Sequence, residues 1–160
     1  MKITPWYSKL MASPDDYTPV MEAYDFYMEE YEKAMAEANE LSKEAKRAPA
    51  MVALKLPGIY SYRWNQLQEM DQILAFLENR EKRVLGQKRR QFREHYAREL
   101  NDSMVEKYAE TDTEVLDIAE TRNFFGLVRN KFLGVTKCHE YLHFQLHNIA
   151  KLRDAGIEGS

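Results

Sequence analysis

Residues 111–153 read TDTEVLDIAETRNFFGLVRNKFLGVTKCHEYLHFQLHNIAKLR. The stretch holds no proline, and its apolar residues recur at helical spacing around most of a helix circumference. A surface helix needs one apolar face, so this one is expected to be buried on two sides. The second side is covered either by the chain's own earlier helices or by another copy of the chain. We favour the second alternative and predict a C-terminal oligomerisation helix.

This helix is expected to begin near Thr111, because Thr111 and Glu114 have the spacing of a capping box, and to end around Asp154. Its predicted oligomerisation residues are apolar and lie between positions 124 and 149. They are Phe124, Phe125, Val128, Phe132, Leu133, Leu142, Leu146 and Ile149.

The rest of the chain also favours helix. The 160 residues include only six glycines and five prolines, which predicts an all-α fold of long helices. We expect an irregular arm over residues 1–19, an acidic helix from Thr18 to about Arg47, and a linker or turn over residues 48–58. Apolar residues at alternating spacings of three and four then predict a helix from Ile59 to about Leu100 with a coiled-coil-like seam, hence a coiled-coil-like hairpin. The predicted division is residues 1–58 (arm, acidic helix and linker) and residues 59–160 (helical core).

Composition sets limits on location and partners. The single cysteine, Cys138, excludes an internal disulfide and favours a reducing cytoplasm, which for a viral protein is that of the host cell. No apolar run is long enough for a signal peptide, and none reaches the roughly 18 residues of a membrane span. We therefore expect a cytoplasmic protein with no membrane partner.

A basic block follows within the long helix, although the net charge of the chain is −3. Our candidate DNA-binding residues are Lys82, Arg83, Lys88, Arg89, Arg90, Arg93 and Tyr96. Cations bind phosphates, and interleaved aromatic rings can stack on unpaired bases. The alternative is a solvated helix face that pairs with the acidic residues of the following segment, residues 102–120.

His139, Glu140 and His143 form a His-Glu-x-x-His pattern, which on a helix can place two imidazoles on one zinc ion. A zinc peptidase is a remote alternative, because a third ligand, a longer form of the motif and a substrate-binding edge strand are all missing. Leu146 and Ile149 stand where the longer form has Gly and His. We predict no catalytic residue, no metal site and no cofactor.

Several short motifs occur together in the second half of the chain. They are Asp112-x-Glu114-Val115-Leu116, Phe124-Phe125-Gly126, Phe132-x-Gly134 and His147-x-Ile149-x-x-Leu152-Arg153. In order and spacing they resemble the C-terminal block of the UvsY recombination mediators of T4-like bacteriophages. Lys82-Arg83-Val84 and the stretch through Arg89 and Phe92 resemble, more loosely, that family's basic and aromatic DNA-contacting stretch. The resemblance covers roughly residues 60–156.

The resemblance implies a non-enzymatic helper of homologous recombination in DNA replication and repair. Such a protein binds single-stranded DNA, forms a homo-oligomeric ring through C-terminal helices, and helps load a RecA-like recombinase onto DNA covered by single-strand-binding protein. Lys82, Arg83 and Arg89 match the family's basic positions, whereas Gln87 stands where a basic residue is expected. Lys88, Arg90, Arg93 and Tyr96 are candidates from composition alone. A helical structural or adaptor protein, such as a phage component, is the main alternative.

Overall fold

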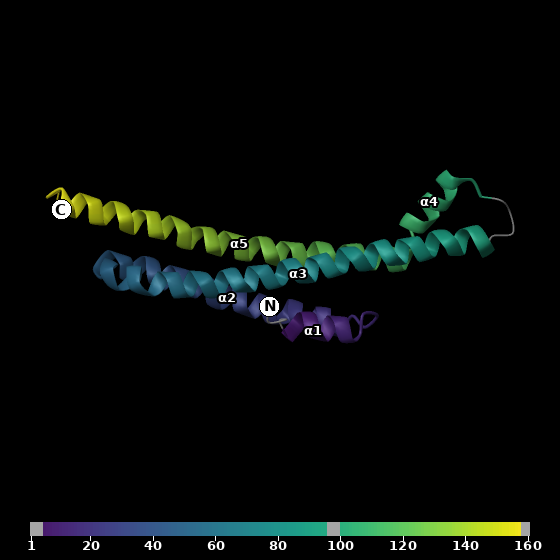
Figure 1. The fold of residues 1–160 in the computed structure, drawn as a ribbon, viewed down its shortest axis with the longest axis horizontal. Helices are drawn as coiled ribbons and strands as arrows, with labels where there is room; N and C mark the ends of the chain where they lie inside the picture. The colour runs from purple at the N-terminus through teal and green to yellow at the C-terminus, as the bar shows by residue number, and fades with distance from the viewer. Residues whose placement is uncertain (1–4, 96–99, 158–160) are drawn as a thin grey trace. The chain divides into compact units, whose positions relative to one another are not determined.

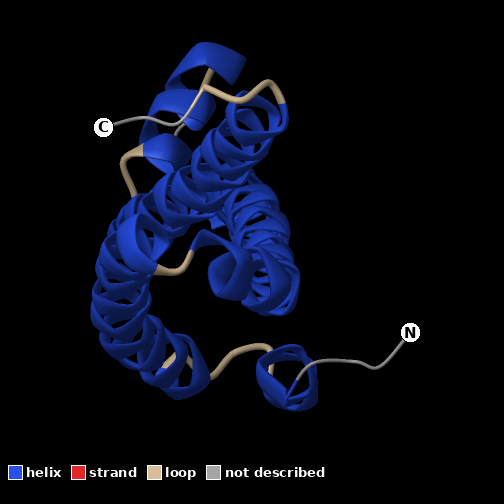
Figure 2. Ribbon diagram, turned by 90° about the vertical axis from the view of Figure 1, so that its left-hand side faces the viewer, coloured by secondary structure: helices blue, strands red, loops and turns tan. Residues whose placement is uncertain are grey.

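The computed structural model describes residues 5–95 and 100–157, and these form helices joined by short loops with no strand among them (Figures 1 and 2). The helices are α1 (Pro5–Ala12), α2 (Thr18–Arg47), α3 (Pro49–His95), α4 (Asp102–Glu110) and α5 (Thr113–Asp154). The all-α prediction is confirmed. The chain divides into two compact units, of which unit 1 comprises Met1–Glu69 with Val128–Ser160 and unit 2 comprises Met70–Leu127. No helix in the described part of the chain is long and apolar enough to cross a membrane.

In unit 1, α2 and the first part of α3 form an antiparallel pair joined by a single residue, Ala48. The amide of Ala48 donates to the carbonyl of Glu44 at 2.7 Å, and its own carbonyl accepts from the amides of Met51 and Val52 at 3.1 and 3.3 Å. Pro49 is the first residue of α3, a position at which a helix needs no amide hydrogen. The proline that was expected to open a linker therefore opens a helix.

The predicted linker over residues 48–58 is wrong, because α3 continues through Pro57 and Gly58. An internal proline removes one helical hydrogen bond and costs roughly 3 kcal/mol. Buried side chains on both sides of Pro57 offset this cost, since Val52 and Leu56 precede it and Leu67 follows it. Tertiary packing thus overrides the local break signal.

The core of unit 1 lies between α2, the first part of α3 and the last part of α5. A buried cluster takes residues from all three helices: Leu41 and Ala45, Val52 and Leu56, and Leu142 and Leu146. Further along, the Phe132 ring of α5 packs edge-on against Tyr27 of α2 with centroids 5.9 Å apart. The last part of α5 is therefore covered by the chain's own helices.

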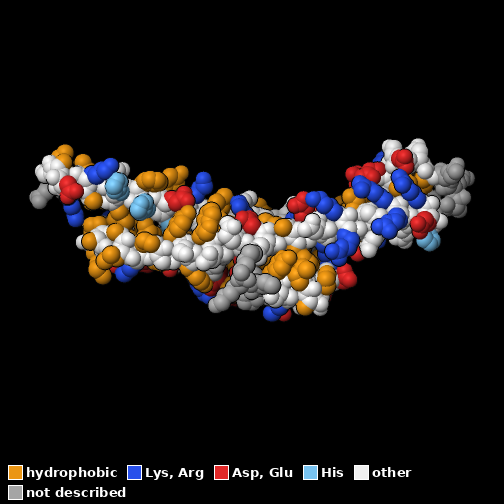
Figure 3. Space-filling view, viewed as in Figure 1, with side chains coloured by type: hydrophobic (Ala, Val, Ile, Leu, Met, Phe, Trp, Pro, Cys, Tyr) orange, Lys and Arg blue, Asp and Glu red, His pale blue; other side chains and the backbone are white. Residues whose placement is uncertain are grey.

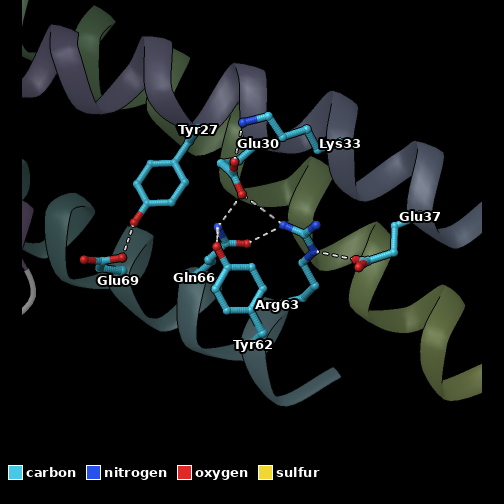
Figure 4. A network of polar contacts seen from close by, with 8 residues as sticks. All are labelled: Tyr27, Glu30, Lys33, Glu37, Tyr62, Arg63, Gln66 and Glu69. Atoms are coloured by element: carbon cyan, nitrogen blue, oxygen red, sulfur yellow. Dashed lines mark hydrogen bonds and ion pairs between the residues drawn. The ribbon is translucent and has the colours of Figure 1, made fainter. Parts of the chain in front are cut away.

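A polar network is enclosed between α2 and α3 (Figure 4). Arg63 donates to Glu30 at 3.2 Å, to Glu37 at 3.0 Å and to Gln66 at 2.9 Å. Glu30 also accepts from Gln66 at 3.0 Å and from Lys33 at 2.8 Å. Glu30, Arg63 and Gln66 are all buried. The charges of Glu30 and Arg63 are therefore stabilised by these hydrogen bonds in place of water.

In unit 2 the remainder of α3 packs with α4 and the first part of α5. Met70, Leu77 and Val84 of the predicted seam are buried, and so is Leu67 of the same seam in unit 1. The apolar face of α3 is therefore confirmed, while the coiled-coil character of the seam stays a prediction. The short helix α4 buries Val105 and Ala109, and its Tyr108 ring lies 5.9 Å from that of Phe92 on α3. The packing of α4 depends on its own short apolar face, and this helix was not predicted from the sequence.

The starts of α4 and α5 are capped by different side chains. Asn101 caps α4 by accepting from the amide of Met104 at 2.9 Å. The capping box at Thr111 is wrong, because the Thr111 hydroxyl donates back to the carbonyl of Lys107 at 2.8 Å and Asp112 accepts from the amide of Glu114 at 3.0 Å. A carboxylate accepts from this amide better than a hydroxyl that already has a partner in α4.

The irregular arm over residues 1–19 is also wrong in part, since α1 spans Pro5–Ala12. Leu10 is fully buried, and the Trp6 ring lies 5.6 Å from that of Phe26 on α2. Burial of Leu10 and the contact between the two rings support a helix too short to be stable alone.

Candidate nucleic-acid interface

The basic block lies on α3 within unit 2, and most of its cations are paired with carboxylates. Lys88 Nζ lies 3.1 Å from Asp112 Oδ1 and 3.1 Å from Glu114 Oε2. Arg89 pairs with Glu106 of α4. The pairing that the sequence offered as the alternative to DNA binding is therefore present.

Two further cations of the block are paired on the exposed surface. Arg93 Nη2 lies 2.7 Å from Asp102 Oδ1, and Lys82 Nζ lies 2.6 Å from Glu78 Oε1 within α3 itself. Both pairs face water, which screens them strongly. Figure 3 shows the result as basic and acidic side chains interleaved over the last part of α3 and α4.

The pairs differ in how tightly they hold the cation. The Lys88 side chain is only 20% exposed, whereas that of Arg93 is 61% exposed. Hydrogen bonds with Glu114 and Asp112 raise the pKa of Lys88 above its usual value, and the bond from Arg89 lowers the pKa of Glu106. Lys88 is thus the least available cation of the block.

Arg83 and Arg90 differ from the others, because both are exposed and neither has a carboxylate partner among the residues that the structure describes. They are seven residues apart on α3, so they share one face of the helix. Arg90 also lines a shallow hollow of about 350 Å³ together with Gln87, Gln91, Glu94 and His95. Tyr96, the remaining candidate, lies outside the described residues.

The predicted oligomerisation residues are mostly inside the chain. Phe125, Val128, Phe132, Leu142 and Leu146 are buried, Leu133 and Ile149 are partly buried, and only Phe124 is exposed. The buried five have the chain's own helices as neighbours and are not available to a second copy in this fold. For these residues the structure shows the other alternative, in which the earlier helices of the same chain cover α5.

A different set of apolar side chains on α5 is exposed. In unit 2 these include Leu116 and Leu127, which are 48% and 60% exposed, and in unit 1 Tyr141 and Leu152, which are 65% and 48% exposed. Each pair is eleven residues apart, which is three helical turns, so its members share a face. If α5 contacts another protein, these residues are the ones positioned to do so.

The three histidines of α5 are in different surroundings. His139 is buried, and burial lowers its pKa. Neither of its ring nitrogens has a hydrogen-bond partner among the residues that the structure describes. His143 and His147 are exposed. Tyr60 donates to Glu140 Oε1 at 2.8 Å, so the carboxylate of the motif already has a partner. Within the described ranges, no group of three or more His, Cys, Asp or Glu side chains is placed to hold a metal ion.

A cavity of about 460 Å³ lies beside this motif in unit 1. Its lining is largely apolar and comes from two helices: Leu56, Pro57 and Tyr60 of α3, and His139, Glu140, His143 and Phe144 of α5.

No family model, curated protein or solved structure matches the chain.

The cations of the basic block can be identified from the sequence, but which of them have a carboxylate partner cannot. The acidic residues 102–120 were identified as possible partners of the basic block. Which acid meets which cation depends on how α4 and the antiparallel α5 pack against α3. Phe124 is 56% exposed and its neighbour Phe125 is buried. This difference depends on which side of α5 is covered by α3. Apolar periodicity alone does not give that side when a helix is apolar around most of its circumference.

Proposed function

We propose that the chain is a non-enzymatic recombination mediator that binds single-stranded DNA. In this role it helps load a RecA-like recombinase onto DNA covered by single-strand-binding protein, as its resemblance to the UvsY mediators implies. The observation that carries the proposal is the face of α3 with Arg83 and Arg90, which have no carboxylate partner among the described residues.

The chemistry of this face suits a phosphate backbone. Each guanidinium presents several donors that bind phosphate in a two-pronged manner. Gln87 and Gln91 add amide donors and acceptors beside Arg90, which can bond to base edges or sugars without sequence preference. Such a small set of cations predicts moderate affinity that falls with salt, by a slope of about −0.7 per phosphate contacted on a single strand.

The test is fluorescence anisotropy with a labelled oligothymidylate at low salt. The double variant Arg83→Ala/Arg90→Ala is expected to bind much more weakly than the unaltered chain. The matched control is Lys46→Ala/Arg47→Ala, which removes the same charge from exposed residues of α2 and is expected to bind normally. No binding by the unaltered chain, or equal losses in both variants, would refute the assignment of this face.

A second candidate is a helical structural or adaptor protein. The observation that favours it is the exposed apolar set of α5, with Tyr141 and Leu127 both at least 60% exposed. Isolated apolar side chains are normal on a surface, but several on one helix are typical of protein contacts. Homo-oligomerisation through this set fits either function.

Light scattering with and without the oligonucleotide separates the two candidates. If the variant Tyr141→Lys/Leu152→Lys forms an assembly of lower mass than the unaltered chain does, the result supports a contact through α5. A large assembly that is indifferent to DNA supports the structural role alone.

A further inference from the structure

Three of the α3 cations that the sequence offers to DNA, Lys88, Arg89 and Arg93, are paired with carboxylates of the segment that follows. Glu106 holds Arg89, while Asp112 and Glu114 hold Lys88 from two sides. Asp102 holds Arg93. These four acids occupy residues 102–114, a segment that we call the acidic cover.

The acidic cover is a built part of unit 2. Val105 and Ala109 are buried, and the Tyr108 ring lies 5.9 Å from that of Phe92 on α3. Asn101 and Asp112 cap the two helices that carry the acids. Packing and helix caps therefore hold the carboxylates beside the basic stretch, so the ion pairs follow from the fold of unit 2.

Each carboxylate occupies the place that a DNA phosphate would take. A guanidinium or ammonium group bonded to a carboxylate must exchange it for the phosphate, and that exchange yields less free energy than the binding of an open cation. The pairs of Arg89 with Glu106 and of Arg93 with Asp102 are exposed and hence weak, so a polyanion can displace them. The expected effect is attenuation of binding and not a block.

We propose that the acidic cover competes with nucleic-acid phosphates for Lys88, Arg89 and Arg93 and so lowers the affinity of the chain for single-stranded DNA. The idea rests on the proposed function. It adds that the chain binds DNA through fewer cations than it carries and releases the strand more readily, as transfer of DNA to a recombinase requires.

The test neutralises three of the four acids of the cover, those that hold Lys88 and Arg89, without removing its caps. The variant Glu106→Gln/Asp112→Asn/Glu114→Gln keeps the side-chain shapes, and Asn caps a helix about as well as Asp. It releases Lys88 and Arg89. If both then contact phosphates, the salt slope becomes more negative by about 1.4, and affinity at about 50 mM salt rises on the order of tenfold.

The matched control is Glu22→Gln/Glu40→Gln/Glu44→Gln, which removes three acids that pair with lysines of unit 1. It changes the net charge equally and is expected to leave the slope unaltered. Circular dichroism checks that both variants stay helical.

The outcomes distinguish the two proposals. If the unaltered chain binds DNA through Arg83 and Arg90 but the cover variant has the same slope and affinity, competition by the cover is refuted and the proposed function stands. Equal gains in the cover variant and the control also refute it, because net charge would then be the cause. If neither the unaltered chain nor the cover variant binds, both proposals fail.

Discussion

Replacement of Arg63 by methionine is expected to destabilise the chain substantially. Arg63 is 5% exposed, and its guanidinium donates to Glu30, Glu37 and Gln66. Methionine keeps an apolar stem of similar length but leaves Glu30 buried without its arginine. Removal of one partner from a buried ion pair costs about 3–5 kcal/mol.

The structure sets the expected loss near the lower end of that range. Glu30 keeps its bonds from Lys33 at 2.8 Å and Gln66 at 3.0 Å, and Glu37 is exposed enough to regain water. We therefore expect a decrease of about 3 kcal/mol in the free energy of unfolding. For a chain of this length that corresponds to a melting temperature lower by roughly 6–12 °C.

Urea denaturation followed by circular dichroism at fixed protein concentration measures the loss. The double variant Glu30→Gln/Arg63→Met removes the stranded charge and is expected to be more stable than Arg63→Met alone. Lys43→Met serves as the control, because its pair with Glu40 is exposed at both ends and should contribute little. A loss below about 1 kcal/mol for Arg63→Met would show that water reaches Glu30, contrary to the enclosed network.

Three further outcomes follow from the packing and from the titrating groups. Phe125→Ala should lose about 3–5 kcal/mol of unfolding free energy while the exposed neighbour Phe124→Ala loses less than about 0.5, and similar losses would contradict the orientation of α5. Because burial lowers the pKa of His139, the unfolded chain binds the proton more readily, and stability should decline as pH falls below the ordinary value of about 6.5. His139→Leu should reduce this decline, as thermal melts between about pH 7.5 and 5.5 will show. Burial raises the pKa of Glu30, but bonds from Lys33, Gln66 and Arg63 outweigh it and lower the pKa overall, so stability should fall again below about pH 4.3 and less steeply in Glu30→Gln.

The helical class and the apolar seam of α3 were predictable because they depend on local preference and periodicity. The wrong predictions for the arm and the linker have a common cause. Prolines lie in both stretches, yet Pro5 and Pro49 begin helices and Pro57 lies inside one. A proline at a helix start and a proline in a loop look alike in sequence, and only the packing of Leu10, Val52 or Leu56 separates them.

The candidate site was predictable in composition but not in availability. Arg83 and Arg89 were both predicted to bind DNA, but Arg89 is held by Glu106 while Arg83 has no carboxylate partner among the described residues. Which cation meets a carboxylate depends on the register of two helices brought together by tertiary packing. No pattern along α3 alone contains that register.

Unit 1 combines two stretches that are far apart in the chain, and this has a consequence during synthesis. The α2–α3 pair, closed by one residue at Ala48, can form as soon as residue 69 is free of the ribosome. Its apolar side, including Leu41 and Leu56, is completed only by Leu142 and Leu146 of α5. At about 5–20 residues per second, residues 70–157 take roughly 4–18 s to add. For that time the nascent chain displays an uncovered apolar strip, so neighbouring chains on one messenger have several seconds in which to associate through it.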